Sequence, residues 1–123
     1  MTKPKQGDII LTDFDPVKGH EQSGYRPALV VSNADFNNAS NLVLVCPITK
    51  TKRGRPMDIP LKDTDTEGYI LCEHVRAVDL RSRGYKATND IVSEKTLLQV
   101  TDILQGALDV VSDKEDEEPK SNT

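Results

Sequence analysis

Short apolar runs separated by polar, Gly- and Pro-containing segments fill most of the chain. The runs at 7–14, 27–32 and 41–49 are rich in β-branched residues and too short for helices, so each predicts a strand. The alternating segment Met57–Leu61 predicts a short fourth strand, and Pro60 favours an edge position for it. Residues 33–40 are rich in Asn and Asp, which predicts a turn or a single helical turn.

The last third of the chain carries the clearest helical pattern. Residues 68–82 begin like a strand and continue as a second strand or a helical turn. Residues 91–111 predict a helix with Ser93 as its N-cap. Its apolar stripe consists of Leu97, Val100, Ile103, Leu104, Leu108 and Val111. Strands followed by one helix predict a mainly β fold with a C-terminal helix, as a small twisted sheet or barrel.

Length and composition set the class of protein. A chain of 123 residues is expected to form one domain, which we assign to residues 1–111. No run of about 18 apolar residues is present, so we expect no membrane segment. Cys46 and Cys72 both lie within apolar runs, which is typical of buried, reduced thiols in a cytoplasmic protein.

The net charge of −4 hides a local excess of positive charge. Residues 112–123 hold five acidic and two basic residues, and we expect this acidic tail to be disordered. By contrast, residues 49–56 carry four positive charges and no negative one, and residues 75–86 carry four against one. Such segments favour a phosphate-binding surface, although two solvated loops would have the same composition.

Four residues form the candidate catalytic set: His20, Glu21, Arg26 and Thr49. Cleavage of RNA without a metal needs a base for the 2′-hydroxyl, a cation for the phosphorane and a proton donor for the leaving oxygen. A carboxylate or imidazole, an arginine fork and a hydroxyl supply these groups. For the His–Glu pair the plainer interpretation is exposed polar surface, and for Thr49 it is a hydrogen bond within a turn.

Other chemistry is less well supported by the sequence. The two histidines and the scattered carboxylates have no metal-ligand spacing, so no metal or cofactor is predicted. The cysteines are expected to be core residues rather than activated nucleophiles. Glu73 and His74 lie in a strand-like segment, where alternation turns only one of them inward, and Arg76 could be its partner.

The motif G-D-x-x-x-x-D-F-D-P…G-x-E-Q-x-G-x-R-P spans residues 7–27. With "VCPIT", "LCEHVRAVDLRSRG" and the closing helix, it resembles the MazF/PemK (Kid)-type toxins over residues 7–108. These are endoribonucleases of type II toxin–antitoxin modules. The resemblance implies a small SH3-like barrel that acts as a homodimer and is neutralised by a cognate antitoxin.

The resemblance also implies an activity: metal-independent, sequence-specific cleavage of single-stranded RNA such as mRNA, leaving 2′,3′-cyclic phosphate and 5′-hydroxyl ends. Arg26 matches the catalytic arginine of the family, Thr49 its threonine, Glu21 its loop glutamate and His20 a histidine of PemK-like members. Glu73 falls where those members place a proposed general base. The expected RNA-binding residues are Lys18, Gln22, Lys50, Lys52, Arg53, Arg55, Glu73 and Arg83.

One departure from the family pattern concerns Leu71, which stands where PemK-like members have an arginine proposed as general acid. Arg26, helped by Thr49, must then stabilise the transition state and donate the proton, with Glu21 or His20 as the base. Phe14, Tyr25 and Phe36 are the nearest aromatic residues for base stacking.

Two alternatives remain open at this point. A non-enzymatic toxin similar to CcdB, which poisons DNA gyrase, would depend on residues 108–111 and not on Arg26. An inactive member of the family that acts as a binding protein is compatible with Leu71.

Overall fold

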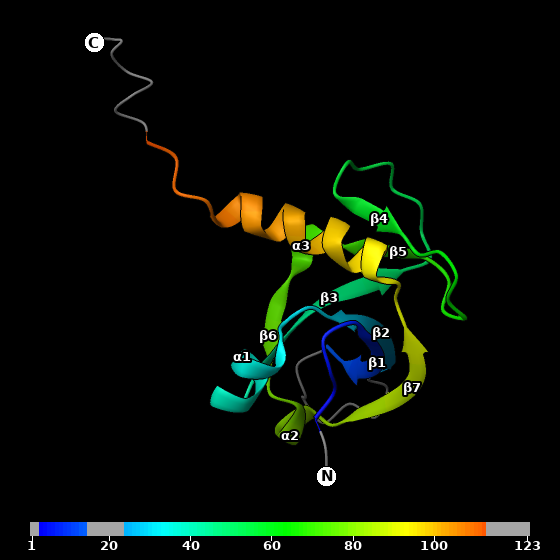
Figure 1. Ribbon diagram of the computed structural model, residues 1–123. Coiled ribbons are helices and arrows are strands. Elements are labelled where there is room, and N and C mark those ends of the chain that lie inside the picture. The colour runs from blue at the N-terminus through cyan, green and yellow to red at the C-terminus, as the bar shows by residue number, and fades with distance from the viewer. Residues whose placement is uncertain (1–2, 15–23, 113–123) are drawn as a thin grey trace, which may run out of the picture.

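The structure is a computed structural model that describes residues 3–14 and 24–112. Its strands are joined in the order β4-β5-β3-β2-β1-β7, and β6 pairs with β3 off this path (Figure 1). All seven strands pair in antiparallel fashion. Their bounds are β1 Asp8–Asp13, β2 Tyr25–Val30, β3 Val43–Thr49, β4 Asp58–Pro60, β5 Tyr69–Leu71, β6 Arg76–Val78 and β7 Tyr85–Ile91.

The helical elements connect or cover these strands. They are α1 Ala34–Ala39, the short 3-10 helix η1 Cys72–His74, α2 Leu80–Arg83 and α3 Glu94–Leu108. A mainly β fold with a C-terminal helix is therefore confirmed. The described sheet path has two ends, β4 and β7, so the hydrogen-bonded sheet is open, and closure into a barrel stays a prediction.

Strand alternation divides the apolar residues between two clusters. Ile9, Leu29, Cys46, Ile48 and Ile70 belong to the cluster that includes Val100 of α3. Their neighbours in sequence point the other way because side chains alternate along a strand. The second cluster consists of Ile10, Ala28, Val30, Val43, Val45 and Val78. The sheet therefore has a face covered by α3 and a face opposite α3.

The helix α3 covers its face as the sequence predicted, but only in part. The side chain of Ser93 accepts a hydrogen bond from the Thr96 amide, which confirms the N-cap. Val100 is fully buried, and Leu97, Ile103 and Leu104 pack against the core.

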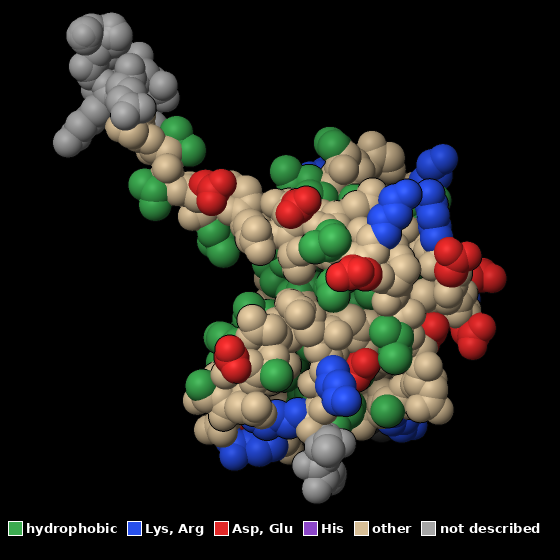
Figure 2. Space-filling model, in the orientation of Figure 1, with side chains coloured by type: hydrophobic (Ala, Val, Ile, Leu, Met, Phe, Trp, Pro, Cys, Tyr) green, Lys and Arg blue, Asp and Glu red, His purple; other side chains and the backbone are tan. Residues whose placement is uncertain are grey.

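The predicted end of the apolar stripe is wrong. Leu108 and Val111 are 81% and 70% exposed, respectively. The helix ends at Leu108, and its last turns extend beyond the strands (Figure 1). Apolar side chains are visible along this extension in Figure 2.

The predicted strands at 7–14, 41–49 and 57–61 correspond to β1, β3 and β4, and β4 is at an edge as Pro60 indicated. The strand predicted at 27–32 begins two residues earlier, because Tyr25 and Arg26 pair with β1. Residues 68–82 form both expected alternatives in succession, namely two strands and a helical turn.

β7 was missed by the sequence analysis. Its sequence YKATNDI has few apolar residues, and none of its seven residues is fully buried. The strand nevertheless pairs with β1, with a bulge between Ile9 and Ile10. Backbone pairing with a central strand, rather than burial of its own side chains, accounts for its formation.

No described helix is long and apolar enough to cross a membrane.

Candidate active site

Arg26 and Thr49 occupy corresponding positions on adjacent strands. Arg26 lies in β2, where it is exposed and pairs with Thr12 of β1. The β2–β3 register pairs Ala28 with Pro47. The pairing ends there; Arg26 lies two residues before Ala28, and Thr49, the half-buried last residue of β3, lies two residues after Pro47. Because side chains alternate along a strand, Arg26 shares the face of Ala28 and Thr49 shares the face of Val45, which is the face opposite α3.

Pairs with the neighbouring strands extend this arrangement across the sheet. Thr49 pairs with Tyr69 of β5, and Thr12 pairs with Tyr85 of β7. We call Tyr69, Thr49, Arg26, Thr12 and Tyr85 the Arg26 row. Tyr69 is half-buried, and the sequence analysis missed it. Its position just before the buried Ile70 was the available signal, because alternation puts Tyr69 on the opposite face.

Gly68, the residue before β5, allows the backbone of β5 to approach Thr49 closely. Its φ angle is +136°, and a Cβ atom at this position would lie 2.4 Å from the Thr49 carbonyl oxygen. Only a residue without a side chain permits this approach. The Thr49 hydroxyl accepts a hydrogen bond from the Thr51 amide at 3.2 Å, which is the turn bond that the plainer interpretation expected.

Arg53 forms a two-bond ion pair with a buried carboxylate. Its Nε donates to Asp58 at 2.8 Å and a terminal nitrogen donates at 2.7 Å. The Asp58 side chain is only 3% exposed. The hydrogen bonds from Arg53 hold the pKa of Asp58 below its ordinary value. Arg53 therefore fastens the β3–β4 loop to the first residue of β4.

Arg55 forms a similar pair with Glu73, but at the surface. Its Nε and a terminal nitrogen donate to the two carboxylate oxygens at 2.8 and 3.1 Å. Arg53 lies 3.8 Å from the same carboxylate. The hydrogen bonds from Arg55 hold the pKa of Glu73 below its ordinary value. A carboxylate with a lowered pKa and an occupied face is poorly suited to act as a general base.

The remaining expected cations are spread over the molecule. Lys50 and Lys52 are exposed in the β3–β4 loop beside Thr49. Arg83 ends α2 and donates to the Asp13 carbonyl at 3.2 Å. Because Asp13 pairs with Tyr25, Arg83 lies near the end of β1 and the start of β2. The two lysines follow the end of β3.

Four predicted site residues, Lys18, His20, Glu21 and Gln22, lie outside the described residues. Among the described residues that flank them in sequence, Asp13 pairs with Tyr25, the residue before Arg26.

The three aromatic candidates for stacking have different surroundings. The guanidinium of Arg76 lies 5.2 Å from the ring centre of Phe14. The Lys86 ammonium lies 5.0 Å from the ring of Tyr25, which is 41% exposed. Phe36 belongs to α1, which joins the other ends of β2 and β3. Phe14 and Tyr25 lie at the end of the sheet that carries Arg26, and Phe36 is not brought to the site.

Leu71 is 8% exposed and pairs with Asp58. Burial raises the pKa of the Cys46 thiol to about 12 and that of Cys72 to about 11. Both cysteines are free and buried, so neither is an activated nucleophile. Among the described residues, no group of three or more His, Cys, Asp or Glu side chains is arranged to hold a metal ion.

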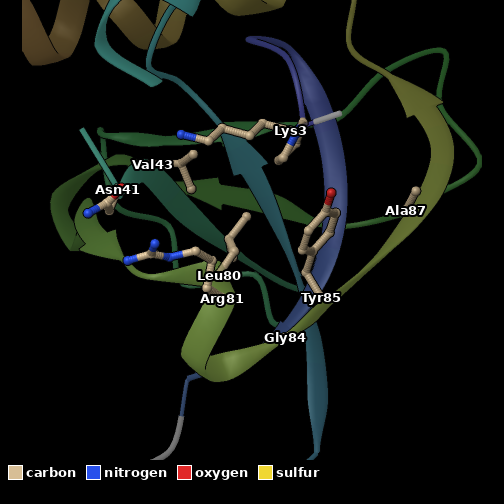
Figure 3. A pocket seen from close by; sticks show the side chains of 9 residues that line it. Lys3, Asn41, Val43, Leu80, Arg81, Gly84, Tyr85 and Ala87 are labelled. Atoms are coloured by element: carbon tan, nitrogen blue, oxygen red, sulfur yellow. The ribbon is translucent and has the colours of Figure 1, made fainter. Parts of the chain in front are cut away.

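A cavity of about 770 Å³ lies away from the catalytic pair. Val43, Leu80 and Tyr85 line it, with Lys3 and Arg81 at its border (Figure 3). Neither Arg26 nor Thr49 contributes to its lining. Its walls are mainly apolar.

The described residues thus form an open antiparallel sheet in which Arg26 and Thr49 lie beside the basic β3–β4 loop. The family model described as "PemK-like, MazF-like toxin of type II toxin-antitoxin system" matches residues 5–108. The chain therefore belongs to this family of toxins.

Individual relatives agree with this assignment. The chain is 36% identical over 95 residues to the endoribonuclease toxin MazF of Escherichia coli K12, covering 77% of this chain and 86% of that protein. It is 38% identical over 110 residues to the endoribonuclease toxin ChpB of the same strain, covering 82% and 94%. The structure of MazE–MazF (Form-II) from Deinococcus radiodurans superposes with a TM-score of 0.76 at 34% identity, covering 85% of this chain and 95% of that one.

Proposed function

We propose that this protein is an endoribonuclease toxin that cleaves single-stranded RNA, including mRNA, at short sequence motifs. The position of Arg26 and Thr49 at the ends of adjacent strands, on the face opposite α3, carries the proposal. The family match and the names of the relatives support the same activity.

The chemical roles follow from the groups present. The RNA 2′-oxygen attacks the adjacent phosphorus, and the 5′-oxygen leaves, which gives a 2′,3′-cyclic phosphate and a 5′-hydroxyl. Arg26 binds the non-bridging oxygens, whose negative charge grows in the transition state. The Thr49 hydroxyl donates a further hydrogen bond. In this proposal no metal takes part.

Proton transfer is assigned to the segment beside Arg26. Glu21 or His20 removes the 2′-hydroxyl proton, since Glu73 is engaged by Arg55. Arg26, assisted by Thr49, supplies the proton of the leaving oxygen. Lys18, Gln22, Lys50 and Lys52 are assigned to binding of the RNA backbone.

The β3–β4 loop and α2 extend the binding surface. Arg53 fastens the loop, Arg55 lies at its surface, and Arg83 stands at the β1 end of the Arg26 row. We further propose that the protein acts as a homodimer in the cytoplasm and that a cognate antitoxin neutralises it; the description of the family as toxins of type II toxin–antitoxin systems supports the antitoxin.

The test is incubation of the purified protein with a long single-stranded RNA in EDTA, beside Arg26→Ala. We expect cleavage at a few short motifs by the unmodified protein and a rate lower by roughly 10²–10³ for the variant. The cyclic phosphate is identified by mass spectrometry of the fragments. If a folded protein leaves the RNA intact, the proposal is wrong, and the binding toxin that depends on residues 108–111 becomes the better account.

A further inference from the structure

The β3–β4 loop is less cationic than its sequence indicates. Residues 50–55 carry four positive charges, but two of them are already paired with carboxylates of this chain. Arg53 is bound by Asp58 and Arg55 by Glu73. Lys50 and Lys52 are the two basic residues of the loop outside these pairs.

The two pairs differ in how accessible they are to water. Asp58 is 3% exposed and Arg53 is 28% exposed, so this pair is part of the folded loop. Glu73 and Arg55 are 32% and 52% exposed. An exposed pair is held weakly, because water solvates both charges when they separate. Of the two arginines in the loop, Arg55 can therefore exchange its carboxylate partner for another anion at a small cost in free energy.

A phosphodiester offers the same two-oxygen edge as a carboxylate. The arginine fork binds either anion through two parallel N–H···O bonds. In this structure Glu73 accepts both bonds of Arg55, at 2.8 and 3.1 Å. The position that a backbone phosphate would take on Arg55 is therefore filled by Glu73.

This position lies further along β3 and β5 than the Thr49–Tyr69 pair. Asp58 pairs with Leu71, and Pro60 pairs with Tyr69, which in turn pairs with Thr49. Glu73 follows β5 by two residues. An RNA strand with its reacting phosphate at Arg26 and Thr49 that continues for a few nucleotides along the β4–β5 side of the sheet would therefore reach Arg55.

We propose that Glu73 is an internal competitor of the substrate, which occupies the phosphate-binding fork of Arg55 until a backbone phosphate of single-stranded RNA displaces it. The inference rests on the proposed function, because it assigns a second phosphate site beside the reacting one. Glu73 then sets a threshold for RNA binding and takes no part in the chemical step.

The experiment measures binding separately from cleavage. A fluorescent single-stranded RNA whose riboses are all 2′-O-methylated is used as the probe, because it has no 2′-hydroxyl to attack. Glu73→Gln removes the charge and keeps the shape. Glu67→Gln is the matched control, since Glu67 is an exposed acid just before β5. Arg55→Gln and the Glu73→Gln/Arg55→Gln double variant complete a cycle.

We expect Glu73→Gln to bind the probe several-fold more tightly than the Glu67→Gln control. The slope of log affinity against log salt should change little in Glu73→Gln, because a phosphate contacts Arg55 in both complexes, whereas the loss of that contact in Arg55→Gln should make the slope shallower by about 0.7. In the Glu73→Gln/Arg55→Gln double variant, the gain in affinity should be absent. The inference is overturned if Glu73→Gln binds no better than Glu67→Gln, or if the gain persists without Arg55.

Cleavage of the unmodified RNA is followed in parallel. If the protein cleaves RNA but Glu73→Gln shows no Arg55-dependent gain in probe affinity, this inference alone is overturned. The binding cycle without cleavage would overturn the proposed function and leave Glu73 as a competitor at a phosphate site. Circular dichroism melts of all variants confirm that binding is compared between folded proteins.

Discussion

The two faces of the sheet are built from neighbouring residues of the same strands, yet they are used differently. Ile48 and Ile70 point to the face that α3 covers and are almost fully buried. Thr49 and Tyr69, the next residues in each direction, point to the opposite face and are half-buried. The helix makes the first face the stability core and leaves one end of the second face open to a ligand.

The comparison shows that alternation of side chains along a strand can separate residues that stabilise the fold from residues that serve function. Changes on the α3 side should alter unfolding and leave the chemistry intact. Changes at Arg26 and Thr49 should alter the chemistry and leave unfolding nearly unchanged. The following predictions test where this separation holds and where it fails.

Gly68→Ala should reduce both stability and RNA cleavage, and it should have the largest effect on stability of the variants considered. The new methyl group would lie 2.4 Å from the Thr49 carbonyl oxygen, and φ is +136°. We expect a loss of about 2–4 kcal/mol in the free energy of unfolding, together with slower RNA cleavage because Thr49 must move. Urea unfolding and cleavage rates check both effects. A variant with unchanged rates would show that Thr49 does not need this position.

Val100→Ala should affect stability alone. Val100 is fully buried between α3 and the sheet, and removing two methyl groups there should cost about 2 kcal/mol. The cleavage rate at a temperature where the variant is folded should match that of the unmodified protein. Slower cleavage by the folded variant would contradict the separation of the two faces.

The ion pair between Asp58 and Arg53 of the β3–β4 loop should make stability depend on pH. Because Arg53 lowers its pKa in the folded protein, the ionised carboxylate stabilises the fold above the unfolded pKa of about 3.9. This contribution is lost as the pH falls through the still lower folded pKa. The urea midpoint of the unmodified protein should exceed that of Asp58→Asn at pH 7, and the gap should narrow below about pH 4. A gap independent of pH would contradict this account.

Leu108→Ala should have the smallest effect. Leu108 is 81% exposed, so little apolar area is lost, and the free energy of unfolding should change by less than about 0.5 kcal/mol. Thermal melting of the variant beside Val100→Ala is the check. A loss comparable to that of Val100→Ala would mean that another surface buries Leu108 in solution.

The sequence was sufficient to predict the elements that bury their own side chains. β1, β3 and α3 all carry clear apolar patterns, and the Ser93 cap marks the start of the helix. β7 has no such pattern, because pairing with β1 stabilises it. The apolar residues at 108 and 111 continue the helical spacing, but the sheet below them has ended.

The site was predictable only as a set of residue types. The order of residues indicated Arg26 and Thr49, and the motif supplied their roles. The sequence could not show that Arg53 and Arg55 are paired with Asp58 and Glu73, because these partners meet only when β4 and η1 are brought together. Composition therefore overstates the free positive charge of the loop.

The most direct test of the central claim is a double-mutant cycle on Arg26 and Thr49, with kcat/KM measured at one cleavage site in RNA. If both side chains act on one phosphate, Arg26→Ala/Thr49→Ala should be hardly slower than Arg26→Ala alone, because residues that act as a unit are not additive. Full multiplication of the two single losses would show that the pair acts independently and would contradict the account.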